Sequence, residues 1–253
     1  EKDALILYKK FILKFLSKKD RKIIKNSKIK VIIDPKGGTG IVAKEIFDEL
    51  DIKADYINME KSNFMRKIEP NEESLNYLQK EIKKHKAEFA AGFDCDADRV
   101  EIMLEDGTLV SGNQILALIT DEILSRIKHP EEETVIVNDA TSYVVKEIAK
   151  NYNAKWKEVE VGEINVVDTM MGFNSPVGGE GSNGGIIIPP SRCRDGILTI
   201  AYLLKTIAEK KKSLKELVDE LPQYYYIKEK RKIKQDFTKI KEKIKQHYLD
   251  NNH

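Results

Sequence analysis

Short apolar segments alternate with amphipathic ones along most of this chain, and this alternation restricts its possible folds more than any other feature. In the first half, hydrophobic periodicity predicts strands and helices in turn. The strands are expected over residues 28–34, 53–57 and 88–93, and the helices over 5–16, 41–50 and 75–85. Strands that alternate with helices form a sheet covered by helices. The pattern therefore predicts an α/β fold.

An antiparallel edge and a second α/β unit follow. Residues 100–104 and 108–110 flank Glu105-Asp106-Gly107, a sequence typical of hairpin turns. After a helix over 113–127, the pattern restarts with strands over 134–138, 155–159 and, around a glycine-rich loop, 177–188, and with helices over 143–151, 163–171 and 197–209. Asp195 is expected to cap the last of these helices, because a carboxylate accepts hydrogen bonds from the free N–H groups at a helix start.

We therefore expect two consecutive α/β domains with mixed sheets flanked by helices, plus a partial C-terminal segment. The first domain is assigned to residues 1–129 and the second to residues 130–222, because a charged turn and Pro222 mark the boundaries. Residues 223–253 are interpreted as a linker and the start of a truncated C-terminal domain, in which one helix has an apolar face.

Composition excludes several classes of protein. With 41% hydrophobic and 34% charged residues, the chain is too apolar to be disordered. Its 44 Lys and Arg residues nearly balance 42 Asp and Glu residues, so we expect no nucleic acid as a partner. The apolar segment 5–16 is short and carries three lysines, which excludes a membrane span and a signal sequence. We expect a cytoplasmic protein that does not bind membranes.

The two cysteines and the first residue carry further information. Cys95 and Cys193 lie far apart and match no metal-ligand spacing, which excludes zinc modules and disulfide scaffolds. The chain begins at Glu1 rather than at Met, so we expect a processed or excised piece of a longer protein.

Three aspartates at alternate positions form the most informative motif. Asp94, Asp96 and Asp98 lie in the acidic loop, residues 94–99, which separates two apolar strands and ends at Arg99. At an effective dielectric constant of about 20, two carboxylates about 5 Å apart repel each other by about 3 kcal/mol. Three converging carboxylates therefore need a cation or must spread into water. Oxygen ligands on a tight loop favour a hard ion, above all Mg²⁺.

The acidic loop has three other interpretations. It can be a solvated acidic turn. An EF-hand fails, because Arg99 occupies the required glycine position and strands flank the loop. A phosphatase with an aspartate nucleophile would use Asp94 to attack and Asp96 as the acid, but no adjacent aspartate pair downstream completes its metal site.

A glycine loop, residues 178–185, is the second motif. Its glycines allow close approach of the backbone to a ligand, while Glu180, Ser182 and Asn183 offer polar groups suited to sugar hydroxyls. The alternative is a wide hairpin loop. Arg192 and Arg194 follow it and either hold a phosphate group or belong to a solvated loop.

Four motifs in this order resemble those of the α-D-phosphohexomutases. They are the acidic loop, the segment Val161-Gly162-Glu163-Ile164-Asn165-Val166-Val167, the glycine loop, and Arg194-Asp195-Gly196-Ile197. The variants are most similar to those of archaeal phosphoglucosamine mutases and their phosphomannomutase/phosphoglucomutase relatives. The resemblance extends from Tyr8 to about Tyr226.

The resemblance implies four domains around a cleft and transfer of a phosphoryl group between positions 1 and 6 of a hexose through a phosphoserine. It implies that Asp94, Asp96 and Asp98 are the Mg²⁺ ligands and that Arg99 is the catalytic residue that neutralises the phosphoryl group. It also implies that Gly179, Glu180 and Ser182 bind the hexose phosphate, whose sugar is glucosamine, mannose or glucose.

The departures from the family pattern concern the outer domains and the two loops. Neither a Ser-His-Asn-Pro nucleophile motif nor the Arg-x-Ser-Gly-Thr-Glu-Pro phosphate loop occurs. The resemblance therefore predicts the two central domains of a mutase, inactive without the outer domains of the parent chain, or alternatively a noncatalytic sugar-phosphate binding or scaffold module. Gly184 replaces a histidine common in relatives, and Cys95 replaces a usual glycine, which requires a negative φ there.

Overall fold

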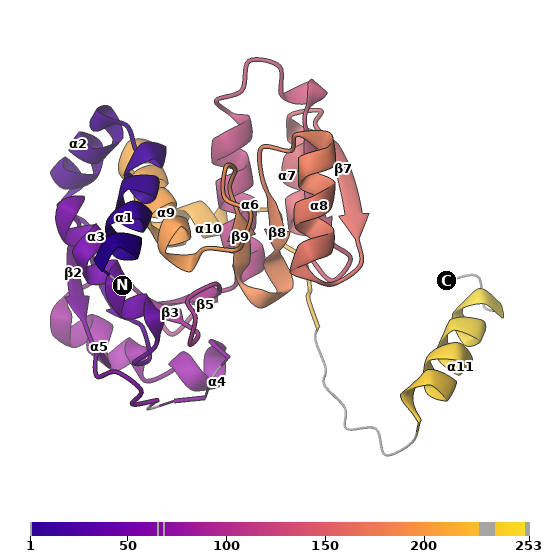
Figure 1. Ribbon diagram of the computed structural model, residues 1–253, viewed down its shortest axis with the longest axis horizontal. Coiled ribbons are helices and arrows are strands. Elements are labelled where there is room, and N and C mark those ends of the chain that lie inside the picture. The colour runs from indigo at the N-terminus through magenta and orange to yellow at the C-terminus, as the bar shows by residue number, and fades with distance from the viewer. Residues whose placement is uncertain (1, 65, 68, 228–235, 251–253) are drawn as a thin grey trace.

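The computed structural model describes residues 2–64, 66, 67, 69–227 and 236–250. Figure 1 shows two groups of strands with helices between and around them. Each group forms one mixed sheet, and the two sheets follow one another along the chain. The expected fold class, two consecutive α/β domains with mixed sheets flanked by helices, is confirmed.

The first sheet has five strands in the order β2-β1-β3-β4-β5. The parallel strands β1 and β3 lie at its centre, and β4 and β5 add the expected antiparallel edge. The strands are β1 Lys30–Asp34, β2 Lys53–Tyr56, β3 Phe89–Phe93, β4 Val100–Leu104 and β5 Leu109–Val110.

The second sheet has four strands in the order β7-β6-β8-β9. Strand β6 pairs in parallel with β7 and β8, and β9 returns antiparallel to β8 through the glycine loop. The strands are β6 Thr134–Asn138, β7 Lys155–Val159, β8 Gly178–Glu180 and β9 Gly185–Ile187. The three predicted strand segments of this half are therefore present.

The helices cover both faces of each sheet. They are α1 Lys2–Phe15, α2 Lys18–Ser27, α3 Ala43–Glu49, α4 Glu72–Leu75, α5 Leu78–His85, α6 Gly112–Leu124, α7 Tyr143–Asn151, α8 Glu163–Phe173, α9 Gly196–Lys210, α10 Leu214–Asp219 and α11 Phe237–Asp250. Three short 3₁₀ helices lie at Thr39–Val42, Pro130–Glu132 and Gly181–Asn183. As predicted, Asp195 caps α9, where its side chain accepts a hydrogen bond from Leu198 N.

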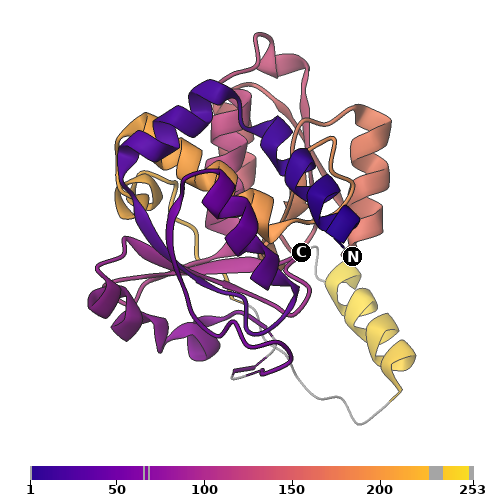
Figure 2. The ribbon, with the colours of Figure 1, turned by 60° about the vertical axis from the view of Figure 1, so that its left-hand side comes forward.

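One apolar core extends from the first sheet to the second. Alternate residues of a strand point to opposite faces. On one face of each sheet, Val31 of β1 and Val135 of β6 contribute to the same large cluster, which also contains buried residues of α6 and α9. Ile32 instead packs with α4 and α5 on the other face of the first sheet, and Ile136 packs with α8 on the other face of the second. The two sheets therefore share a central layer of helices (Figures 1 and 2).

Two ends of the chain differ from the rest. Helix α2 was not predicted, and it packs against α9. Helix α11 lies apart from both sheets in Figures 1 and 2, and its Ile244 and Leu249 are exposed. None of the helices in the described part of the chain has the length and apolar character of a membrane span.

Candidate functional site

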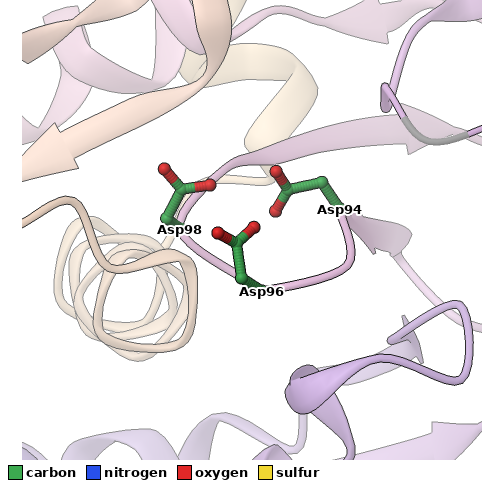
Figure 3. Close-up of side chains that lie close together, drawn as sticks. All are labelled: Asp94, Asp96 and Asp98. Carbon is green, nitrogen blue, oxygen red and sulfur yellow. The ribbon is translucent and has the colours of Figure 1, made fainter. Parts of the chain in front are cut away.

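The acidic loop brings its three carboxylates together. It leaves the end of β3, at the centre of the first sheet, and returns into β4. One carboxylate oxygen each from Asp94, Asp96 and Asp98 lies within 4.8 Å of the other two. Figure 3 shows all three side chains over the inside of the loop. Asp94 is fully buried, Asp98 is half-buried and Asp96 is exposed, so the cluster opens to solvent on one side.

Backbone hydrogen bonds from three other segments hold the acidic loop in this shape. Thr39 N donates to Cys95 O at 2.8 Å, Gly196 N donates to Ala97 O at 2.9 Å, and Val100 N at the loop's end donates to Gly184 O at 3.0 Å. A Cβ atom on Gly38 would lie 2.2 Å from Cys95 O, so the glycine turn after β1 is a structural support for the acidic loop.

The local backbone explains two residues of the acidic loop. Cys95 is not among the residues with positive φ, so a side chain in place of the family's usual glycine fits, as the sequence required. Ala97 instead has a φ of 60°, in the left-handed region that costs a residue with a Cβ about 1 to 2 kcal/mol. The loop therefore turns sharply between Asp96 and Asp98.

Arg99 pairs with the buried end of the acidic cluster. Its Nε lies 2.5 Å from Asp94 Oδ2 and 3.5 Å from Asp98 Oδ1. Burial raises the pKa of Asp98 to about 7, and the hydrogen bond and charge of Asp94 act in the same direction. The positive charge of Arg194 lowers this pKa but does not offset the rise.

The donor set of the cluster fits a hard cation. Its three ligand side chains are all carboxylates, and the facing atoms are oxygens. Mg²⁺ prefers oxygen ligands and often keeps open positions for water or phosphate. The chemistry of these residues therefore agrees with the magnesium site expected from the sequence.

The glycine loop has one buried acid and one half-buried serine. Glu180 is 3% exposed, and its Oε1 accepts hydrogen bonds from Asn138 Nδ2 and from Gly162 N, both at 2.9 Å. Gly179 has a φ of 155°, and a Cβ there would lie 2.3 Å from the backbone of Gly185. Ser182 is half-buried at the tip of the loop.

Both loops reach one groove. Arg99 from the acidic loop and Gly181 and Ser182 from the glycine loop line a groove of about 460 Å³, together with Asn113 at the start of α6. Gly179 and Glu180 are buried and are not among its lining residues. The structure thus places Arg99 and Ser182 on one groove. Asp94, Asp96 and Asp98 are not among its lining residues, and Glu180 lies behind its surface.

A buried network behind the acidic loop was not predicted. Asp34, at the end of β1, accepts hydrogen bonds from Arg66 Nε at 2.8 Å, from Asn58 Nδ2 at 3.1 Å and from Tyr77 Oη. Arg66 Nη2 also donates to Phe93 O, the residue before Asp94. Asp34 was visible in the sequence as an acid that ends an apolar strand, but Arg66 and Tyr77 belong to no motif.

Tyr226 and the two arginines before α9 differ in their relation to the groove. Tyr226 also lines the groove, and its hydroxyl donates to Ala140 O at 3.1 Å. Arg192 is exposed and lines a separate pocket beside α8. The Arg194 guanidinium contacts acidic side chains, so the structure does not support its interpretation as a phosphate clamp.

Fold and site together define the class of this protein. Two consecutive α/β/α domains carry an acidic loop and a glycine loop on one groove. Residues 8–107 match the sequence model of phosphoglucomutase/phosphomannomutase alpha/beta/alpha domain II, and residues 111–225 match the model of domain III. The chain belongs to this phosphoglucomutase/phosphomannomutase family.

Curated relatives agree. The chain is 31% identical to a phosphoglucomutase/phosphomannomutase of Thermococcus kodakarensis, over 94% of this chain and 52% of the relative. It is 30% identical to a phosphomannomutase of Methanocaldococcus jannaschii, over 96% and 53% respectively. A probable phosphoglucosamine mutase of Methanosarcina acetivorans is 31% identical over 80% of this chain and 45% of the relative. The chain thus spans about half the length of these relatives, which are named as enzymes of sugar-phosphate conversion.

Solved structures share the fold. A putative phosphomannomutase from Thermus thermophilus matches with a TM-score of 0.76 and 23% identity, over 85% of this chain and 49% of that one. Aspergillus fumigatus N-acetylphosphoglucosamine mutase, solved in complex with GlcNAc-6P and magnesium, matches with a TM-score of 0.60 and 17% identity, over 80% of this chain and 52% of that one.

Proposed function

We propose that this chain is the cation- and sugar-binding part of a phosphohexomutase that interconverts hexose 1-phosphate and hexose 6-phosphate. The sugar is glucosamine, mannose or glucose. One observation carries the proposal: the carboxylates of Asp94, Asp96 and Asp98 converge within 4.8 Å beside Arg99, which lines the same groove as the glycine loop.

Each residue has a role in the proposal. Asp94, Asp96 and Asp98 hold Mg²⁺, which when bound stabilises negative charge on a transferring phosphoryl group. Arg99 presents its guanidinium to the same phosphoryl group, because positioning and charge neutralisation account for most of the catalysis of phosphoryl transfer. Ser182 offers its hydroxyl to the sugar, Gly179 lets the backbone approach closely, and Glu180 fixes the shape of the loop in addition to its expected contact with ring hydroxyls.

The remaining machinery would come from the outer domains of a parent chain. They would supply the phosphoserine and a phosphate-binding loop, so the present residues alone are expected to give no turnover. The cytoplasmic location, and the lack of nucleic acid and membrane partners, belong to the same proposal. A noncatalytic sugar-phosphate binding module is the second candidate, because no Ser-His-Asn-Pro motif occurs in these 253 residues. An upstream serine loop in the same reading frame would decide for the enzyme.

Isothermal titration with Mg²⁺ tests the cation site. We expect Asp96→Asn to weaken binding at least tenfold, which is about 1.4 kcal/mol, since a carboxylate ligand becomes a neutral amide. Asp96 is exposed, so its substitution leaves the core intact. Asp168→Asn, at an exposed acid of α8, is the matched control and should bind as the wild type does. Equal affinities for Asp96→Asn and the wild type would end the magnesium assignment.

A further inference from the structure

Arg194 contacts an acidic residue in each of the three other motifs that resemble those of the family. It lies between β9 and α9 and reaches three carboxylates. Its Nη2 pairs with Asp98 of the acidic loop, and its Nη1 lies 2.6 Å from Glu180 Oε2 of the glycine loop. Its backbone N donates to Glu163 Oε1 at 2.7 Å, and its Nε lies 3.6 Å from Glu163 Oε2. One guanidinium therefore links the cation site to the sugar loop.

These contacts are shielded from water. The Arg194 side chain is 16% exposed, and the side chains of Asp98 and Glu180 are 19% and 4% exposed. Charge pairs on an open surface are weak because water screens them, whereas removing one partner of a buried pair leaves the other charge unpaired at a high cost. Removal of Arg194 would therefore leave a shielded carboxylate on each of the two loops without this partner.

The glycine loop is shaped to admit this side chain. A Cβ atom on Gly185 would lie 2.1 Å from Arg194 Cδ and 2.9 Å from its Cγ. The aliphatic part of Arg194 thus lies directly on the backbone of the glycine loop. A displacement of the guanidinium would therefore change the packing on that backbone as well as the ion pair with Glu180.

The fork of the guanidinium is what makes the bridge possible. Its two Nη atoms point to acids on two different loops, Asp98 and Glu180. A lysine ammonium is a compact point charge and lacks this planar, two-pronged geometry. A lysine at this position would keep the charge but could not hold both carboxylates in the same way.

We propose that Arg194 is a positioning residue that couples cation binding at the acidic loop to sugar-phosphate binding at the glycine loop; this rests on the proposed function. Arg194 and a cation compete for the Asp98 carboxylate. When a cation takes Asp98, the guanidinium pairs more fully with Glu180 and Glu163, which fixes the glycine loop for the sugar. Each ligand therefore tightens the binding of the other by the same factor.

Titration calorimetry of the full chain tests the coupling. Mg²⁺ is titrated with and without the tightest ligand among glucosamine, mannose and glucose 1-phosphate, and the sugar phosphate is titrated with and without Mg²⁺. For the wild type we expect each ligand to tighten the other at least fivefold. In Arg194→Gln, Mg²⁺ alone should bind at least threefold more tightly, because the competing charge is gone. The sugar phosphate should bind at least tenfold more weakly and without dependence on Mg²⁺.

A damaged fold would give a different result. If Arg194 had a structural role alone, Arg194→Gln would bind both Mg²⁺ and the sugar phosphate more weakly. The proposal instead requires the affinity for Mg²⁺ to rise and the affinity for the sugar phosphate to fall. Arg194→Lys keeps the charge and guards against misfolding of the Gln variant, and it should also lose the coupling. Arg192→Gln, at the exposed neighbouring arginine, is the matched control and should keep it.

The outcomes separate this inference from the proposed function. Coupling of wild-type size in Arg194→Lys, or a parallel loss of both affinities in Arg194→Gln, overturns the role of Arg194 alone. A wild-type chain that binds neither Mg²⁺ nor any of the three sugar phosphates would overturn the proposed function, and this inference with it.

Discussion

The side chain of Asp195 both caps α9 and makes a long-range contact with Tyr8 of α1. Its carboxylate accepts hydrogen bonds from Leu198 N at 2.8 Å and from the hydroxyl of Tyr8 at 2.8 and 2.9 Å, although Tyr8 and Asp195 are far apart in the sequence. Burial raises the pKa of this carboxyl, and the hydrogen bonds from Leu198 and Tyr8 offset the shift only in part.

The raised pKa predicts a pH dependence of stability. Between about pH 4, where a free aspartate titrates, and the raised pKa, the folded protein binds more protons at Asp195 than the unfolded chain does, so its contribution to the free energy of unfolding decreases as pH rises. Asp195→Asn keeps an oxygen for the cap and removes the titration. The stability of the wild type relative to this variant, from urea denaturation at several pH values, should therefore decrease from about pH 4 upward. A constant difference would contradict the assignment.

The site residues that could be predicted from the sequence are those that lie close together along the chain. Asp94, Asp96 and Asp98 are close in sequence, and repulsion among them already indicates a cation. The partners of Glu180 could not be found in this way, because Asn138 and Arg194 reach it only after the second sheet forms. Tertiary pairing therefore limited the prediction of the site.

Among the elements, α6 illustrates how a helix start supports the site. Gly112 is its first residue, and a Cβ atom there would lie 2.1 Å from Gly184 Cα and 2.7 Å from Gly181 O. The helix thus packs directly on the backbone of the glycine loop. The sequence predicted the helix from residue 113 but gave no reason for the glycine before it.

This close approach predicts a large effect of a single methyl group. Gly112→Ala should destabilise the protein by about 1 to 3 kcal/mol through overpacking and weaken sugar-phosphate binding. Gly172→Ala is the matched control, since that glycine is exposed in α8 and a Cβ atom added to it would meet no other atom within 4 Å. It should stabilise the helix by about 0.5 kcal/mol. Thermal unfolding of both variants measures the contrast, and equal shifts would refute it.

Most elements could be predicted because their apolar residues recur with the period of a strand or a helix. Helix α2 was missed because it is polar and buries only Asp20 and Ile24. Its signal was a cap rather than a period: Ser17 Oγ accepts from Asp20 N at 3.1 Å, and Asp20 Oδ2 accepts from Ser17 N at 2.8 Å. Asp20 thus takes the place in this capping box that glutamate or glutamine usually takes, so the pair Ser17 and Asp20 indicated the start of a helix.

For the whole molecule, the shared core is the feature that matters most. The expected domains 1–129 and 130–222 stay a prediction, and the two family-model matches divide the chain at 108–110. Whichever division is used, α6 and α9 contribute to the core beneath both sheets. Sequence patterns show which face of a helix is apolar, but not that two sheets bury the same helices.

A shared core predicts that both sheets unfold together. Trp156 in β7 is the only tryptophan of the chain, so its fluorescence reports on the second sheet alone. Far-ultraviolet circular dichroism reports on the helices of both halves. In urea, the two signals should change with the same midpoint, as in a two-state transition. Separate midpoints would show that the two halves are stable independently.

The common helical layer also has a consequence for the separation of the two domains. A gene cut between the two would leave α9 without half of its surroundings, although every residue from Gly196 to Ile207 is buried. We therefore expect either half, produced alone, to expose an apolar patch where α9 is now covered and to aggregate. Gel filtration of the two halves would test this, and a monomeric, folded half would contradict it.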